Sequence, residues 1–240
     1  MCGRFLLSLI PEEYAGLLRI DHVPTLDPEL FAPRLNIAPT QQILIARRDA
    51  NGQGERRLAA SRWGMIPPWT LSLDSVKNPI FNARSETAWE KPMFKGAART
   101  GRCVVPASGF YEWRKPATPG GRKQPFLIKR SDASPMFFAG LNAFWRADDL
   151  AESEPIASCV ILTTTPNEAM EAVHDRMPVI LRDVASIDRW LTPEPVDRSV
   201  VEDLLGPCPS ADLELTPIDR VGDNRRTESG PDKQSPTLFD

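Results

Sequence analysis

Short apolar runs bounded by turn-forming residues dominate this chain, and this pattern predicts a structure built mainly from β-strands. Gly, Pro, Asn and Asp cluster between the runs. The segments predicted to form strands are Gln42–Arg47, Arg57–Trp63, Arg102–Pro106, Gly109–Arg114, Pro125–Lys129, Met136–Leu141, Ile156–Thr163 and Val179–Leu181. The first two flank the turn sequence Asn51–Gly54 and therefore predict a hairpin.

A few segments instead carry signals of short helices. Tyr14, Leu17 and Leu18 are spaced i, i+3 and i+4, which gives one apolar face to a helix that starts at a proline. Thr165 is a possible helix cap, with Pro166 at the first helical position. The predicted helices are Pro11–Ile20, Pro166–Val173, Arg182–Trp190 and Arg198–Leu205.

Length and composition predict one domain with a polar tail. The chain has 240 residues, of which 41% are hydrophobic and 25% charged, so it can bury a substantial core. Neither internal repeats nor a linker divides it. We therefore predict a single domain over residues 1–222. Residues 223–240 are polar with few core-forming side chains, which predicts a disordered C-terminal tail.

Charge and cysteine usage narrow the classes of function. The net charge of −3 gives no global attraction to a polyanion, so binding of nucleic acid would need a local basic groove. The four Cys lack metal-binding spacing and there are only two His, so we expect neither a metal site nor a cofactor. Signal-peptide, membrane-spanning and lipidation patterns are absent from the sequence, which predicts a cytoplasmic protein without a membrane partner.

The first residues carry the strongest candidate chemistry. If Met1 is removed, Cys2 presents an α-amine and a thiol two carbons apart, with reference pKa values of about 7.7–8.0 and about 8.5. Both groups are then partly nucleophilic near neutral pH, and together they can close an aldehyde into a five-membered thiazolidine. The alternative is that Cys2 is simply a small apolar residue at the start of a strand.

Three further polar positions are candidates for a reactive site. In Ile80–Thr87, Asn82 and Arg84 alternate and would share one face of an extended chain. Glu112 lies among aromatic residues, where burial would raise its carboxyl pKa and suit it to proton transfer. His174 can titrate near pH 6.5. Each also has an ordinary interpretation, because a strand Glu can face solvent and a lone His can be a satisfied polar residue.

The segment Trp63–Trp69 is apolar but contains Gly64 and the pair Pro67–Pro68. It can therefore form neither a regular helix nor a central strand. Such a loop either packs under another segment or displays its side chains as a wedge.

In the order of the chain, these pieces resemble the SRAP family (SOS-response-associated peptidase, also called abasic-site processing proteins). The matching pieces are Cys2-Gly3-Arg4-Phe5, Asn36-Ile37-Ala38-Pro39, Trp63-Gly64 with the Pro-Trp loop, Phe81-Asn82-Ala83-Arg84, Gly109-Phe110-Tyr111-Glu112-Trp113 and His174-Asp175-Arg176-Met177-Pro178. The resemblance implies an α+β domain of curved, mostly antiparallel β-sheets around a central pocket, with short flanking helices. A basic groove would lead single-stranded DNA into that pocket.

The resemblance also implies an activity, namely covalent capture of abasic sites in single-stranded DNA as a thiazolidine crosslink that shields the lesion. Cys2 would be the nucleophile after removal of Met1. Asn82 would hold its α-amine and the opened sugar, and Glu112 and His174 would transfer protons in this lyase-type chemistry. The implied DNA contacts are Arg4, Arg84 and Arg176 on phosphates, Ile66, Pro67 and Trp69 beside the base stack, and Asn36 and Pro39. Thr70 follows Trp69 where many relatives have a second Trp, so Trp69 would act with Pro67 and Ile66.

Two other functions fit the same residues. Cys2 could serve an N-terminal nucleophile hydrolase, with its own amine as the base, and the family name records a proposed peptidase activity. The chain could also be a passive single-strand binder with a structural Cys2. We expect a monomer that takes single-stranded DNA as its partner.

Overall fold

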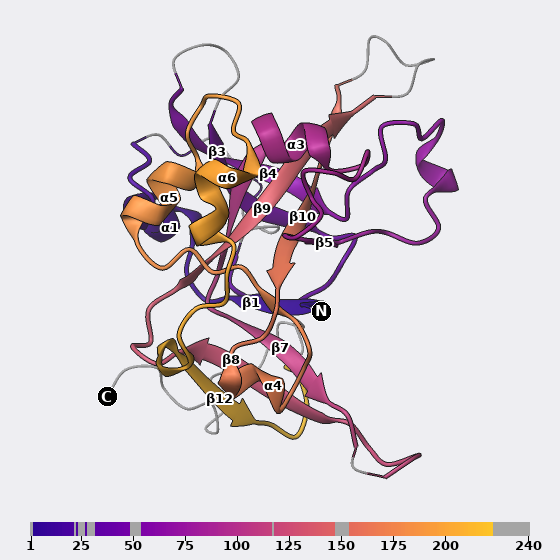
Figure 1. The fold of residues 1–240 in the computed structure, drawn as a ribbon, viewed down its shortest axis with the longest axis vertical. Helices are drawn as coiled ribbons and strands as arrows, with labels where there is room; N and C mark the ends of the chain where they lie inside the picture. Colours follow the sequence, from indigo (N-terminus) through magenta and orange to yellow (C-terminus); the bar gives the residue numbers. More distant parts are fainter. Residues whose placement is uncertain are drawn as a thin grey trace.

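The computed structural model describes residues 2–21, 23, 27, 32–48, 54–116, 118–146 and 154–222. Most of the hairpin turn expected at 51–54 and the tail expected at 223–240 lie outside these ranges. Two β-sheets with short helices around them make up the fold (Figure 1). This arrangement confirms the predicted α+β class.

The first sheet has five strands, and the start of the chain lies inside it. In order across the sheet, the strands are β12 (Leu213–Pro217), β8 (Gln124–Arg130), β7 (Gly109–Arg114), β1 (Arg4–Leu7) and β2 (Arg34–Ile37). Each pairing is antiparallel. β1 is thus hydrogen-bonded on both sides.

The second sheet is larger and curls on itself. Its order is β11 (Met177–Pro178), β10 (Ile156–Thr164), β4 (Arg56–Trp63), β3 (Gln42–Arg48), β6 (Arg102–Ala107) and β9 (Met136–Trp145). β9 also pairs with β10, so five of the strands close into a barrel, and β5 (Asn82–Arg84) pairs with β10 outside that ring. The parallel pairings among the described strands are those of β10 with β4 and with β5.

A shared aromatic core joins the two sheets. Phe5 of β1 packs edge-on against Trp63 of β4 and Phe138 of β9, with ring centroids 5.1 and 6.3 Å apart. Phe110 of β7 reaches the same Phe138 ring at 5.9 Å. All four rings are fully buried. Burial of these side chains fixes the first strand of the chain against the barrel.

The helices are shorter than the sequence predicts. They are α1 (Pro11–Leu17), α3 (Lys95–Thr100), α4 (Glu168–Glu171), α5 (Val184–Trp190) and α6 (Arg198–Val201), with 3₁₀ turns η1 (Leu73–Ser75), η3 (Glu202–Leu204) and η4 (Ser210–Asp212). Among the described residues, no helix is long and apolar enough to cross a membrane.

Backbone geometry explains the early helix ends. α1 stops before Ile20 because Arg19 takes the left-handed conformation, with φ 54°. The cap of α4 is Asn167 rather than Thr165, since the Asn167 side chain accepts the main-chain N–H of Met170 at 3.0 Å.

Two other predicted elements also differ. Asp183 caps α5 by accepting the N–H of Ser186 at 2.7 Å, so this helix starts at Val184 and not at Arg182. The strand expected at Val179–Leu181 is an extended segment after β11 that joins the barrel through an isolated bridge between Ile180 and Phe138.

Candidate active site at the start of the chain

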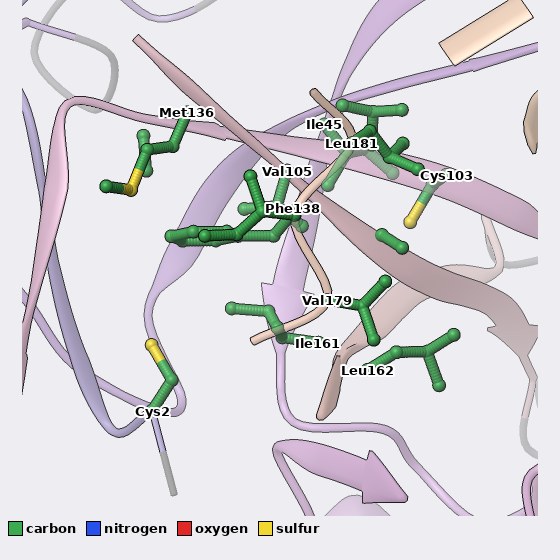
Figure 2. Close-up of a cluster of buried hydrophobic side chains, with 14 of the residues drawn as sticks. Cys2, Ile45, Cys103, Val105, Met136, Phe138, Ile161, Leu162, Val179 and Leu181 are labelled. Atoms are coloured by element: carbon green, nitrogen blue, oxygen red, sulfur yellow. The ribbon is translucent and has the colours of Figure 1, made fainter. Parts of the chain in front are cut away.

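Cys2 lies immediately before β1, inside the protein. Its side chain is fully buried within the hydrophobic core. Figure 2 shows it at one edge of a group of buried side chains that includes Phe138 and Ile161. The flanking strands fix this position, because Arg4 pairs with Tyr111 of β7 and Phe5 pairs with Ile37 of β2.

Asn82 holds the main chain of Cys2. Its Nδ2 donates a hydrogen bond to the Cys2 carbonyl oxygen at 2.9 Å. Its Oδ1 is buried and accepts no hydrogen bond from the part of the chain that the structure describes. A buried amide oxygen without a donor is uncommon in proteins and can receive an N–H or O–H from a ligand. The pairing of β5 with β10, in which Asn82 is opposite Ile161, sets this geometry.

The Cys2 thiol is held in its protonated form. Burial raises its pKa far above the ordinary value, and the nearby negative charge of Glu112 raises it further. The Cys2 Sγ lies 4.0 Å from the Arg4 carbonyl oxygen, as a weak donor. In this environment Cys2 is a neutral thiol at neutral pH, so a thiolate is not its resting state.

Glu112 of β7 is buried, so the alternative of a strand Glu that faces solvent does not apply. Its side chain is 4% exposed. Burial raises the pKa of this carboxyl to about 7. β1 and β7 run antiparallel with Arg4 opposite Tyr111, so the next step along β7 brings Glu112 beside the residues before β1. A carboxyl with this pKa can both give and take a proton near neutral pH.

His174 follows α4 and is about one quarter exposed, with 23% of its side-chain surface accessible. Its Nδ1 accepts the main-chain N–H of Arg176 at 3.0 Å and lies 2.9 Å from a carboxylate oxygen of Asp175. The first contact suits a neutral ring and the second a protonated one. Burial lowers the pKa of His174 below 6.5, so the ring is neutral at pH 7, with its proton on Nε2.

β10 brings these residues together from distant parts of the sequence. Thr163 pairs with Arg84 on one side and with Pro178 on the other. The strand therefore carries the segment with Asn82 on one edge and the segment that follows His174 on the other.

The three arginines predicted to bind phosphates differ in exposure and in the partners that their guanidinium groups already have. Arg84 is exposed, and its guanidinium makes no hydrogen bond or ion pair with the described residues. Arg4 is half-buried and donates to the Gly3 carbonyl oxygen at 3.0 Å. The Arg176 side chain is 11% exposed and binds both carboxylate oxygens of Glu86, at 2.6 and 2.8 Å. Glu86 therefore competes with any phosphate for Arg176.

Of the three side chains that the Pro-Trp loop was predicted to place beside a base stack, Trp69 is exposed, Pro67 is half-buried and Ile66 is buried. Ile66 is 1% exposed and packs against Trp145, so its side chain does not lie on the surface of the loop, and its contact with a base stack stays a prediction. Pro67 is half-buried, whereas Trp69 is 61% exposed. Leu71, which the sequence did not single out, is 81% exposed. Trp69 and Leu71 are therefore the most exposed large apolar side chains of this segment.

The remaining predicted contacts lie beside the start of β1. Asn36, near the end of β2, and Pro39, just after it, are half-buried. Because β2 is antiparallel to β1, its last residues run alongside Arg4 and the residues before it. Across the described residues, His, Cys, Asp and Glu form no group of three that could hold a metal ion.

Sequence reasoning missed Glu86. This residue follows Arg84 by two positions and could have been noticed as the carboxylate of that segment, but only the fold shows that it pairs with Arg176.

The exposed Arg84 yields a direct prediction. Arg84→Glu should weaken binding of undamaged single-stranded DNA and flatten its dependence on salt, because one phosphate contact is replaced by a repulsive charge. The matched control is Arg130→Glu, since Arg130, the last residue of β8, pairs with Asp132 in the turn that follows. Fluorescence anisotropy at several salt concentrations measures both. An unchanged salt slope in Arg84→Glu would remove Arg84 from the phosphate contacts.

Known proteins align with this chain over nearly its whole length. The chain is 36% identical to abasic site processing protein YoqW of Bacillus subtilis, covering 95% of this chain and 97% of that protein. It is 33% identical to abasic site processing protein YedK of Escherichia coli, covering 95% and 96%. A crystal structure of a protein from Bordetella bronchiseptica superposes with a TM-score of 0.73 at 28% identity, covering 91% of this chain and 100% of the other.

A second crystal structure, of a protein from Bacteroides thetaiotaomicron, shares the fold with a TM-score of 0.77 at 24% identity, covering 90% and 92% of the two chains. A model of the family described as SOS response associated peptidase (SRAP) matches residues 1–223. The family model covers most of the chain, and relatives with more than 30% identity align with nearly all of it. The chain therefore belongs to the SRAP family.

Proposed function

We propose that this protein processes abasic sites in single-stranded DNA by forming a thiazolidine crosslink through Cys2 once Met1 has been removed. The observation that carries the proposal is the contact of Asn82 with the Cys2 main chain, beside a carboxyl whose pKa burial raises to about 7. Relatives that share a third of the sequence are named abasic site processing proteins, which supports the same substrate here.

The first steps use the α-amine. A ring-opened abasic sugar carries an aldehyde, and the amine of Cys2 adds to its carbon to give a carbinolamine. Protonation of the hydroxyl by Glu112 lets water leave, and a C=N bond forms. The buried Oδ1 of Asn82 can accept an N–H of the amine or an O–H of the sugar, which would hold the two reactants together.

The last step uses the thiol. The Cys2 sulfur adds to the imine carbon, and its proton passes to the nitrogen through Glu112 or His174, which closes the five-membered ring. Effective molarities for such well-placed groups can reach about 10⁵ M or more. Ring closure also removes the imine, which would otherwise acidify the adjacent sugar carbon and promote strand cleavage by β-elimination. The strand is thereby kept intact.

The neutral state of the thiol bears on the competing peptidase function. A cysteine hydrolase attacks with a thiolate, and burial holds the Cys2 thiol protonated. In ring closure the basic imine nitrogen lies two carbons from the sulfur and can take the sulfur proton as the C–S bond forms, whereas an amide nitrogen is not basic. A thiol that is held protonated therefore suits ring closure better than attack on an amide.

Intact mass tests the proposal directly. Protein shown by mass to lack Met1 is mixed with a uracil-excised single strand and denatured. We expect a heat-stable product whose mass is the sum of protein and DNA less one water. The same strand without excision is the control. An unmodified oligonucleotide would disprove the proposed function, and shortened DNA without a crosslink would show simple lyase activity.

Glu112→Gln should change the pH dependence of capture. The protonated fraction of Glu112 falls above pH 7, whereas the fraction of free amine rises through about pH 8. In the wild-type protein these effects offset each other only between about pH 7 and pH 8, so the rate should level off there and fall at higher pH. In Glu112→Gln the rate should be lower and should rise through pH 8 without the later fall. Single-turnover gels measure the rates, and the same pH profile in both proteins would exclude Glu112 as the acid.

A further inference from the structure

A separate pocket of about 750 Å³ opens in the barrel half of the molecule. It lies where β3, α3 and β9 meet the segment after α5, elements grouped in the upper part of Figure 1, away from the N-terminus. Its walls include Arg47, Arg48, Arg102, Phe144 and Thr192. None of the residues predicted for the Cys2 site lines it. Its volume is in the range of small-molecule sites.

The wall of this pocket is positively charged. Three arginines line it. A carboxylate lies beside it, that of Glu194, which accepts the hydroxyl of the lining Thr192. It offsets part of the charge of Arg48 and Arg102. Arg102 is 5% exposed and donates to five main-chain carbonyls, among them those of Trp190 at 2.8 Å and Glu194 at 3.0 Å. Burial lowers its pKa to about 10, so it remains charged at neutral pH. A buried cation bound to carbonyl groups makes the adjoining space favourable for an anion.

Arg48 adds hydrogen-bond donors to this charge. Its Nε donates to the Leu191 carbonyl oxygen and one terminal nitrogen donates to that of Gly54. A guanidinium has more N–H groups than these two bonds use, and its planar fork matches a phosphate. The side chain is thus held in place by the protein with donors to spare.

An aromatic ring stands at the same pocket. Phe144 of β9 lines the pocket and is 52% exposed, so its ring is open to a ligand. The Arg47 guanidinium carbon lies over the ring, 5.0 Å from its centroid. An exposed ring next to arginines is the combination that proteins use to bind a base and its phosphate, with stacking worth roughly 1–3 kcal/mol.

We propose that this pocket binds a nucleotide, with the phosphate on the remaining N–H donors of Arg48 and the base against Phe144. Arg102 adds positive charge but no hydrogen bond, because its five N–H groups are already used by main-chain carbonyls. The shared chemistry is a phosphate joined to an aromatic base. It can come from a free nucleotide or from one unit of a DNA strand. Because the pocket and the Cys2 site have no residue in common, this proposal stands or falls independently of the proposed function.

Calorimetry on the full-length Cys2→Ala protein tests the pocket without interference from covalent capture. The probes are dAMP, inorganic phosphate and an undamaged single-stranded oligothymidine. We expect dAMP to bind more tightly than phosphate. Phe144→Ala should weaken dAMP binding about tenfold, and Phe144→Leu, which keeps most of the apolar surface, should do so nearly as much. Arg48→Gln should weaken dAMP and phosphate alike.

A matched control comes from another arginine–aromatic pair. Arg114 lies over Phe126, 5.1 Å from the ring centroid and outside the pocket, so Arg114→Gln should leave dAMP binding unchanged. Thermal melting of each variant identifies any that fails to fold, and Phe144→Leu then decides the ring's role.

The probes also separate the two sources. Binding of dAMP that depends on Phe144 supports a site for free nucleotides, and Phe144-dependent binding of the oligonucleotide without dAMP supports a site for a strand. Equal binding of phosphate and dAMP, unaffected by Phe144→Ala, would overturn the proposal. So would the absence of binding by all three probes at millimolar concentration, or an acidic peptide that binds while dAMP does not.

Discussion

Replacing Cys2 by Ala should abolish the heat-stable crosslink while leaving an imine that a reductant can trap. The Ala variant keeps the α-amine once Met1 is removed but has no sulfur to close the ring. The C=N bond therefore persists, and β-elimination should cut the strand. Denaturing gels with and without cyanoborohydride, combined with intact mass, measure all three products. The expected loss of the untrapped crosslink is complete, since no second thiol is available at the same carbon.

The other cysteines provide the control. Cys208 is buried beside Asn167, far along the chain from the candidate site, and Cys208→Ala should crosslink like the wild type. A heat-stable crosslink formed by Cys2→Ala without reductant would mean that the thiol is not the closing group. A protein that retains Met1 should give no heat-stable crosslink, because the Cys2 nitrogen is then a peptide amide. Intact mass identifies that form and so separates a processing defect from a chemical one.

Trp63→Ala should lower the free energy of unfolding by about 3–5 kcal/mol, the usual cost of truncating a buried Trp. The ring is fully buried and packs edge-on against Phe5 and Phe81, with centroids 5.1 and 5.7 Å away. Its Nε1 also donates to the Phe81 carbonyl oxygen at 2.9 Å. Because Phe81 precedes Asn82, the same change should slow capture by the folded fraction.

Urea denaturation measures the stability change. Trp63→Phe keeps an aromatic ring but loses the hydrogen bond, so it should lie between the wild type and Trp63→Ala. Trp69→Ala is the matched control, because Trp69 is 61% exposed and its loss should change stability by less than about 0.5 kcal/mol while weakening DNA binding. A loss below about 1 kcal/mol for Trp63→Ala would contradict its central place in the core.

Most strands could be predicted because their local patterns agree with the fold. The hairpin of β3 and β4, with Gln42 opposite Arg62 and Arg48 opposite Arg56, follows from two apolar runs and a turn sequence. β1, β2 and β12 are short and depend on partners far along the chain, such as Phe5 with Phe110. α3 was missed because only Ala98 of its six residues is buried, which leaves no helical apolar stripe.

In the candidate site, too, features set by neighbouring residues could be considered in advance, whereas contacts between residues far apart in the sequence could not. The aromatic neighbours of Glu112 made its burial one of two interpretations, and the fold decides between them. The pairing of Arg176 with Glu86 could not be predicted, because 90 residues separate them and the strand between them is β10. The burial of Ile66 also depends on a distant partner, Trp145, so the pattern of the loop alone could not show which of its side chains stay at the surface.

The place of β1 between β2 and β7 makes the number of residues between Cys2 and Phe5 as important as their identity. Phe5 is locked into the aromatic core, and side chains reverse direction at each step of an extended chain. One inserted or deleted residue ahead of Phe5 would displace Cys2 by about 3.3 Å and turn it to the opposite side. Point changes at Gly3 or Arg4 can be compensated by neighbouring groups, whereas a change in length cannot.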